Sequence, residues 1–223
     1  MSDIVTNMIT SFDSHPKPDE KKVGLFFGSF NPIHVGHLII ANYILNATDL
    51  AEIWFVVSPH NPHKKKSSLL EDYHRLAIVK EAIDDNLRFK ASDIEFGLPQ
   101  PSYTVDTLAY LKEKYPEKLF SLIMGEDNLR SFHKWKNYEV ILENNPIYIY
   151  PRTYTIQEIE GKNISVESIT NKIKSHSNIT FTDAPIIQIS SSLIRRMIKA
   201  GKSVQYLLNE PAFKYVDEMN FYK

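Results

Sequence analysis

The chain of 223 residues contains no cysteine, which excludes a disulfide framework and zinc sites built on thiolates. No apolar run approaches the length of about 18 residues that a membrane-spanning helix needs. The formal net charge is only −1, so a general attraction to nucleic acid or acidic membranes is excluded and any basic function must be local. The first 22 residues hold four acidic side chains and no continuous apolar core, which argues against a secretory signal. These absences predict a cytoplasmic protein without nucleic-acid or membrane partners.

What is present is an ordinary globular composition, 43% hydrophobic and 24% charged, with enough length for one α/β domain. We expect residues 23–223 to form that domain. Residues 1–22 are expected to be an N-terminal extension, either a flexible terminus or a short docked helix, since Ile4, Met8 and Phe12 share a helical face before Pro16.

From Val23 onward, apolar strand-like runs alternate with helical stretches, which is the pattern of βαβ units. The pattern predicts an α/β fold, a doubly wound open parallel sheet of the Rossmann-like kind with helices on both faces. Thr104 is a candidate N-cap, and Gly201 is a candidate C′ glycine. Strands are predicted at 23–28, 52–58, 88–91, 119–124, 146–150 and 179–182, and helices at 36–46, 72–84, 104–114, 166–174, 192–200 and 211–219.

The segment GSFNPIHVGH at 28–37 lies where the first predicted strand turns into a helix. Gly28 at the strand end lets the backbone approach a ligand, and the helix start directs free N–H groups at the same place, so an anion is expected there. His34 and His37 lie on one side of the helix start, where each imidazole can donate a hydrogen bond to a phosphate and a nearby anion favours its protonated form. A metal site is the alternative for His-x-x-His, but no third ligand is apparent.

Two further segments repeat this arrangement. The predicted strand 119–124 stops at Gly125, and Asp127 can then accept hydrogen bonds from sugar hydroxyls or serve only as a helix cap. The segment ISSSLIR at 189–195 opens another predicted helix, where serine hydroxyls and Arg195 can surround a phosphate or merely cap the helix.

Together, GSFNPIHVGH and ISSSLIR resemble the two signatures of the nucleotidyltransferase superfamily, His-x-Gly-His near the N-terminus and Ile-Ser-Ser-Thr-x-Ile-Arg near the C-terminus. Ser192 replaces the usual threonine and keeps the hydroxyl. Within that superfamily the chain is similar to bacterial nicotinate-nucleotide adenylyltransferases over roughly residues 22–220. The closer likeness rests on Pro62-His63-Lys64, PSYTVDTL at 101–108, Gly125-Glu126-Asp127, Trp135, Pro151-Arg152 and Tyr206-Leu207-Leu208.

Two departures from that family's pattern concern the substrate pocket. Asn61 stands where members usually have the first proline of Pro-Pro-His, and Lys136 stands where many carry a tyrosine that helps hold the pyridine ring.

The resemblance implies transfer of the adenylyl group of ATP to nicotinate mononucleotide, with Mg²⁺ held mainly by the substrate phosphates and no metal site made by the protein. It implies catalytic roles for His34, His37, Lys64 and Arg195. It assigns ATP binding to Gly28, Ser29, Phe30, His34, His37, Gly125, Asp127, Ser191, Ser192 and Arg195, and acceptor binding to Asn31, Tyr103, Thr104, Trp135, Lys136 and Arg152.

Other functions stay open at this point. A nicotinamide mononucleotide or pantetheine-phosphate adenylyltransferase would share both phosphate motifs, although the SYTVDTL segment and Trp135 argue against the latter. A nucleotide-binding regulator without turnover is the alternative outside enzymes, and the intact histidines and Arg195 speak against it. A homo-oligomer is possible, and the sequence does not decide it.

Overall fold

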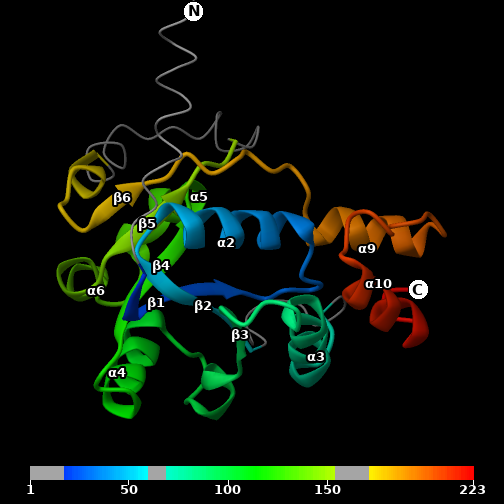
Figure 1. Ribbon diagram of the computed structural model, residues 1–223, viewed down its shortest axis with the longest axis horizontal. Coiled ribbons are helices and arrows are strands. Elements are labelled where there is room, and N and C mark those ends of the chain that lie inside the picture. The colour runs from blue at the N-terminus through cyan, green and yellow to red at the C-terminus, as the bar shows by residue number, and fades with distance from the viewer. Residues whose placement is uncertain (1–17, 60–68, 154–170) are drawn as a thin grey trace, which may run out of the picture.

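A computed structural model of the chain describes residues 18–59, 69–153 and 171–223. Predictions about residues 1–17, Lys64 and the first part of the helix at 166–174 lie outside these ranges, and the described part of that helix, 171–174, is helical. The described residues form a six-stranded sheet with strand order β3-β2-β1-β4-β5-β6, parallel throughout (Figure 1). The strands are β1 (Asp19–Gly28), β2 (Leu50–Val57), β3 (Phe89–Ser92), β4 (Leu119–Gly125), β5 (Ile147–Tyr150) and β6 (Ile179–Phe181).

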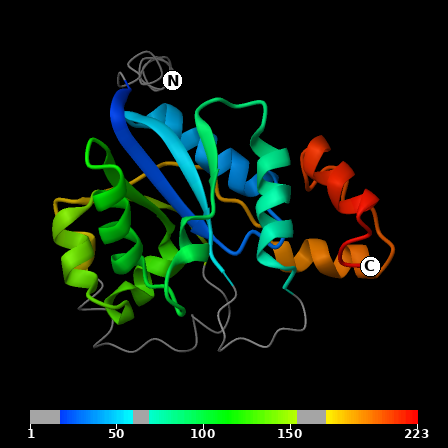
Figure 2. The ribbon, with the colours of Figure 1, turned by 90° about the horizontal axis from the view of Figure 1, so that it is seen from below.

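Helices cover both faces of the sheet. They are α2 (Val35–Ala47), α3 (Asp72–Ile83), α4 (Thr104–Lys114), α5 (Glu126–Ser131), α6 (Tyr138–Asn144), α9 (Ser191–Lys199) and α10 (Glu210–Glu218). Figure 1 shows α2 and α4 on opposite sides of the sheet, and Figure 2 shows α3, α9 and α10 gathered at one end.

The two-faced covering follows from the strands being apolar on both sides. In β1, Leu25 contributes to a hydrophobic core with Leu111 of α4, whereas the next residue, Phe26, contributes to a second core with Ile44 of α2. Successive side chains of a strand point to opposite faces, so a continuous apolar run supplies both cores at once. The predicted fold class, a doubly wound parallel sheet with helices on both faces, is confirmed.

The strand order reverses between β1 and β4, which pair through Leu25 and Leu122. The chain first builds outward from β1 through β2 to β3, then crosses over to β4 and builds the other half. In such sheets ligands bind beyond the carboxyl strand ends at this reversal. Those ends are Gly28 and Gly125, as the sequence predicted.

Several predicted boundaries were wrong. β1 begins at Asp19 rather than at Val23, because Asp19 pairs with Leu50 although its side chain is exposed and lies outside the apolar run. The predicted bounds of α4, 104–114, are confirmed, but its N-cap is Tyr103 and not Thr104. Two short helices, α5 and α6, were missed because six or seven residues show too little periodicity. Gly201 was predicted correctly: it follows α9 with a φ of +66°.

Candidate active site

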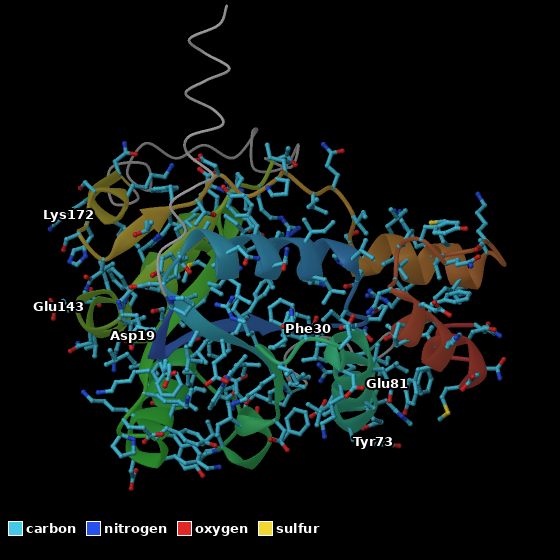
Figure 3. The ribbon with its side chains drawn as sticks, viewed as in Figure 1. Asp19, Phe30, Tyr73, Glu81, Glu143 and Lys172 are labelled. Atoms are coloured by element: carbon cyan, nitrogen blue, oxygen red, sulfur yellow. The ribbon has the colours of Figure 1, made fainter. Side chains whose placement is uncertain are left out.

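The loop between β1 and α2 begins the site. Phe30 has a φ of +42°, a left-handed conformation that turns its ring back over Gly28. A Cβ atom on Gly28 would lie 2.9 Å from that ring, so the missing side chain makes room for Phe30. Phe30 is 2% exposed and lies inside the fold, unlike the surface residue Tyr73 (Figure 3). The structure therefore places the Phe30 side chain in the core, and it does not line the cleft at the carboxyl ends of the strands, so the predicted contact with ATP finds no support from its side chain.

His34 and His37 lie at the start of α2. His34 is the N-cap residue, and its backbone N–H donates to Nδ1 of His37 over 3.2 Å. His37 in its neutral form therefore carries its proton on Nε2. The two rings stack with centroids 3.8 Å apart. Gly36 allows this arrangement, because a Cβ atom there would lie 3.0 Å from the His34 ring and 2.6 Å from Ile187.

Both histidines are held neutral. Burial, and then the positive charge of Arg152, lowers the pKa of His34 to about 4. Burial also lowers the pKa of His37 well below its ordinary value, with His34 and Arg152 adding to the effect. Without an anion, the protonated forms expected from the sequence are therefore disfavoured. A neutral imidazole still donates one N–H, and Nδ1 of His34 has no hydrogen-bond partner among the described residues.

The start of α9 braces the same loop. Ser190 caps the helix by accepting from the N–H of Leu193 (3.2 Å). Ser191 instead donates to the carbonyl of Pro32 (2.9 Å), and Arg195 donates to the carbonyl of Asn31 (2.7 Å). Ser190 is therefore the helix cap, and the ligand interpretation is left for Ser191 and Ser192.

A cleft of about 670 Å³ joins these elements at the carboxyl ends of the strands. Eleven of the predicted site residues line it, and they come from the β1–α2 loop, α2, α4, the turn before α6, the end of β5 and the start of α9. These residues are Gly28, Ser29, Asn31, His34, His37, Thr104, Trp135, Arg152, Ser191, Ser192 and Arg195.

Besides Phe30, four predicted residues within the described ranges do not line this cleft: Tyr103, Gly125, Asp127 and Lys136. Gly125 ends β4 in the core, and the Asp127 carboxylate folds back toward it, so that a Cβ atom on Gly125 would lie 2.3 Å from Oδ1 of Asp127. Lys136 places its ammonium 2.9 Å from Oδ2 of Asp106 and 4.7 Å from the centre of the Tyr103 ring. Lys136 and Tyr103 therefore form an exposed group with Asp106 next to the cleft.

Arg75 is a residue that the sequence analysis missed. Its side chain is fully buried and donates to the carbonyls of Ser29, Ser58 (2.9 Å) and Leu70 (3.0 Å), besides an ion pair with Asp72. One guanidinium thus ties the loops that follow β1 and β2 to the start of α3. The available signal was an arginine on the apolar face of the predicted helix 72–84.

Glu95 was also missed. It is buried at the cleft, where the hydroxyl of Thr107 donates to its Oε1 over 2.8 Å. Burial raises the pKa of Glu95, while hydrogen bonds from Thr107, Ser58 and Ser102 oppose that rise. Glu95 thereby links the loop after β2 to the segment that precedes and begins α4.

In the part of the chain that the structure describes, no three His, Cys, Asp or Glu side chains come together in a way that would hold a metal ion. Among the same residues, no helix has the length and apolar character needed to cross a membrane.

Comparison with known proteins places the chain. A family model described as cytidylyltransferase-like matches residues 25–197. A relative from Christiangramia forsetii, named probable nicotinate-nucleotide adenylyltransferase, is 57% identical over 203 residues, which cover 91% of this chain and 99% of the relative. The chain belongs to the nicotinate-nucleotide adenylyltransferase family. A second member with the same name, from Flavobacterium johnsoniae, is 57% identical over 202 residues, with 91% and 99% covered.

A solved structure agrees on the fold. Nicotinic acid mononucleotide adenylyltransferase from Plasmodium falciparum, complexed with NaAD, superposes with a TM-score of 0.69 at 21% identity, covering 91% of this chain and 98% of that one. The superfamily and the family that GSFNPIHVGH, ISSSLIR and the middle segments indicated are thereby confirmed.

Proposed function

We propose that this nicotinate-nucleotide adenylyltransferase family member joins ATP to nicotinate mononucleotide, giving nicotinate adenine dinucleotide and pyrophosphate. The observation that carries the proposal is that one cleft contains both hydrogen-bond donors for phosphates and a flat surface for the acceptor ring. His34, His37 and Arg195 supply donors for phosphates, while Thr104 and Trp135 supply a flat, partly apolar surface with a hydroxyl. The names of the relatives from C. forsetii and F. johnsoniae support the same acceptor.

The reaction is an in-line displacement at phosphorus. A phosphate oxygen of the mononucleotide attacks the α-phosphorus of ATP, a new P–O bond forms, and the bond from the α-phosphorus to the bridging oxygen breaks to release pyrophosphate. No covalent intermediate with the protein is required. Catalysis then consists of alignment and of stabilising the charge that gathers on the phosphate oxygens.

The neutral histidines suit this task. The N–H on Nε2 of His37, and one on His34, donate to oxygens around the reacting phosphorus without holding a proton that must first be lost. Arg195 and Ser192 lie one turn apart at the start of α9 and bind the outer phosphates. The Arg195 guanidinium is already oriented by the Asn31 carbonyl.

Magnesium fits as a metal that the substrates hold. Mg²⁺ retains waters and binds through phosphates, so it does not need a dedicated set of protein ligands. When bound, it neutralises phosphate charge and assists departure of pyrophosphate.

The acceptor lies at the other end of the cleft in this proposal. The Trp135 ring makes an edge-to-face contact with Phe132, with the ring centroids 5.3 Å apart, and supports the pyridine ring. Thr104 offers a hydroxyl to the carboxylate. Arg152 follows β5 and contacts ribose or phosphate. Roles for Asp127 at the ribose and for Lys64 at the phosphates stay predictions, as do the cytoplasmic location and a homo-oligomeric state.

The test measures pyrophosphate release by the purified chain with Mg-ATP and each of three acceptors. We expect turnover with nicotinate mononucleotide at least about tenfold faster than with its amide analogue or with phosphopantetheine, because one extra charge–dipole contact contributes about 1.5 kcal/mol or more. A preference for the amide contradicts the acceptor assignment. No turnover with any of the three contradicts enzymatic function and favours a nucleotide-binding regulator. Chelation of Mg²⁺ should stop the reaction, and added Mg²⁺ should restore it.

A further inference from the structure

The last residues of the chain return to the cleft. Tyr222 donates its hydroxyl to Oδ1 of Asn31 over 2.8 Å, across 191 positions of sequence. Figure 2 shows the C-terminus beside α9 and α10, the end of the molecule where the β1–α2 loop is braced. The contact therefore joins the end of the chain to the loop that precedes His34.

Asn31 is well placed to transmit this contact. It is 2% exposed, its side-chain oxygen also accepts from the N–H of Leu70 (3.3 Å), and its backbone carbonyl accepts from Arg195. The residue thus connects the phosphate loop to α9 and to the start of α3. Since Asn31 also lines the cleft, a shift of its side chain alters the wall that meets the substrate.

The tail is built to hold Tyr222 in this position. The Tyr222 backbone has a φ of +65°, a left-handed conformation that a residue with a side chain keeps only when its surroundings fix it. The neighbouring Phe221 ring packs on His74 of α3 at 4.6 Å, and the Phe221 N–H donates to the carbonyl of Val216. Burial raises the pKa of Tyr222, so its hydroxyl stays a donor at any physiological pH.

We propose that Tyr222 is a positioning residue for the β1–α2 loop. Its hydroxyl fixes Asn31 and, through Asn31, the segment from Gly28 to His37. It acts through Asn31 and does not itself touch substrate. The expected effect of Tyr222 on turnover rests on the proposed function, whereas its expected effect on the order of the loop does not.

The decisive variant is Tyr222→Phe, which removes only the hydroxyl. Amide hydrogen exchange of the Gly28–His37 segment in the protein without substrates should become about three- to tenfold faster, the range expected for one lost hydrogen bond. At 25 °C, with the folded state of the variant checked by circular dichroism, kcat should fall by a similar factor.

Tyr215→Phe is the matched control. Tyr215 belongs to the same aromatic tail, with its ring 6.1 Å from Phe221, but its hydroxyl makes no hydrogen bond within the described residues. This variant should match the wild type in both exchange and kcat.

The outcomes separate the two proposals. Unchanged exchange in Tyr222→Phe, or a fall in melting temperature with kcat preserved, overturns the positioning role and leaves Tyr222 as a purely structural residue. An equal effect in Tyr215→Phe also overturns it. If the wild type turns over none of the three acceptors, the proposed function fails, and the exchange measurement alone then decides the role of Tyr222.

Discussion

His34 and His37 stack with their ring centroids 3.8 Å apart and their planes 26° apart, at the first turn of α2. Two imidazolium ions would repel strongly at this distance in a buried site, so the stacking itself favours neutral rings. The N–H of the His34 backbone then fixes which nitrogen of His37 carries the proton. The pair is therefore prepared as a set of directed donors and not as a cluster of positive charge.

Replacing His37 with alanine removes one of these donors. We expect His37→Ala to lower turnover by about a hundredfold or more, the usual cost of losing one donor that stabilises a transition state. Pyrophosphate release measures the effect, and circular dichroism checks that the fold is intact. His176→Ala, in the turn before β6, is the control and should keep wild-type turnover. Retention of a tenth of the activity in His37→Ala would remove its central role.

Stability should depend on pH through His34. Its pKa lies near 4 in the folded chain and near 6.5 when unfolded, so below pH 6.5 the unfolded state takes up a proton that the folded state refuses. The free energy of unfolding should be highest above pH 6.5 and should lose about 3 kcal/mol as the pH falls to about 4.

Urea unfolding at pH 7 and pH 4.5 measures this dependence in the wild type and in His34→Gln. The variant cannot titrate at this position, so its loss of stability over the same interval should be smaller. Equal losses in the two proteins would show that His34 is not the titrating group.

Arg75 should matter for both stability and turnover. Arg75→Lys cannot reach three loop carbonyls at once, and we expect it to lower the free energy of unfolding by about 3 kcal/mol and kcat by about tenfold. Arg88 is the matched control. It donates hydrogen bonds to two backbone carbonyls, those of Leu50 and Ala51, but at the opposite end of β2 from the cleft. Arg88→Lys should cost stability and leave kcat within about twofold. A loss of kcat in both variants would point to general destabilisation.

Two adjacent residues, Trp135 inside the cleft and Lys136 outside it, test which side chains bind the acceptor. Trp135→Ala should raise KM for nicotinate mononucleotide about tenfold, as expected from the loss of one stacking surface. Lys136→Met should change that KM by less than about twofold, because the ammonium is engaged by Asp106 and Tyr103 outside the cleft lining. Steady-state kinetics with varied acceptor measures both. The reverse ranking would restore Lys136 as an acceptor-binding residue.

The parts of the fold that sequence predicted are those with a strong local signal. All six strands were found. In β1, β2, β4 and β5 the signal is a short apolar run, whereas β3 and β6 offer only one or two apolar residues between helical stretches. Gly201 was found because a left-handed residue after a helix favours glycine. Helices α5 and α6 were missed since their few turns depend on packing and not on periodicity. The start of β1 was missed because Asp19 is paired in the sheet while its side chain is exposed.

The same distinction applies to the site. Loop residues with motif character, such as His34 and Ser191, were predicted from their position at a helix start, and they do line the cleft. Phe30 has the same motif character, but its left-handed backbone turns the ring into the core. That rotation depends on the space above Gly28, which the sequence alone does not reveal.

By itself, the sequence determined the order of the six strands and of the longer helices, the two helix starts that line the cleft, and the family, because these depend on local patterns and on motifs whose spacing is fixed along the chain. Only the tertiary structure decided which candidates share one cleft, that burial lowers the pKa of His34 and His37, and that Arg75 and Tyr222 hydrogen-bond to the β1–α2 loop. Burial and hydrogen bonds between residues up to 191 positions apart arise when the sheet and its covering helices are assembled, and no local pattern in the chain encodes them.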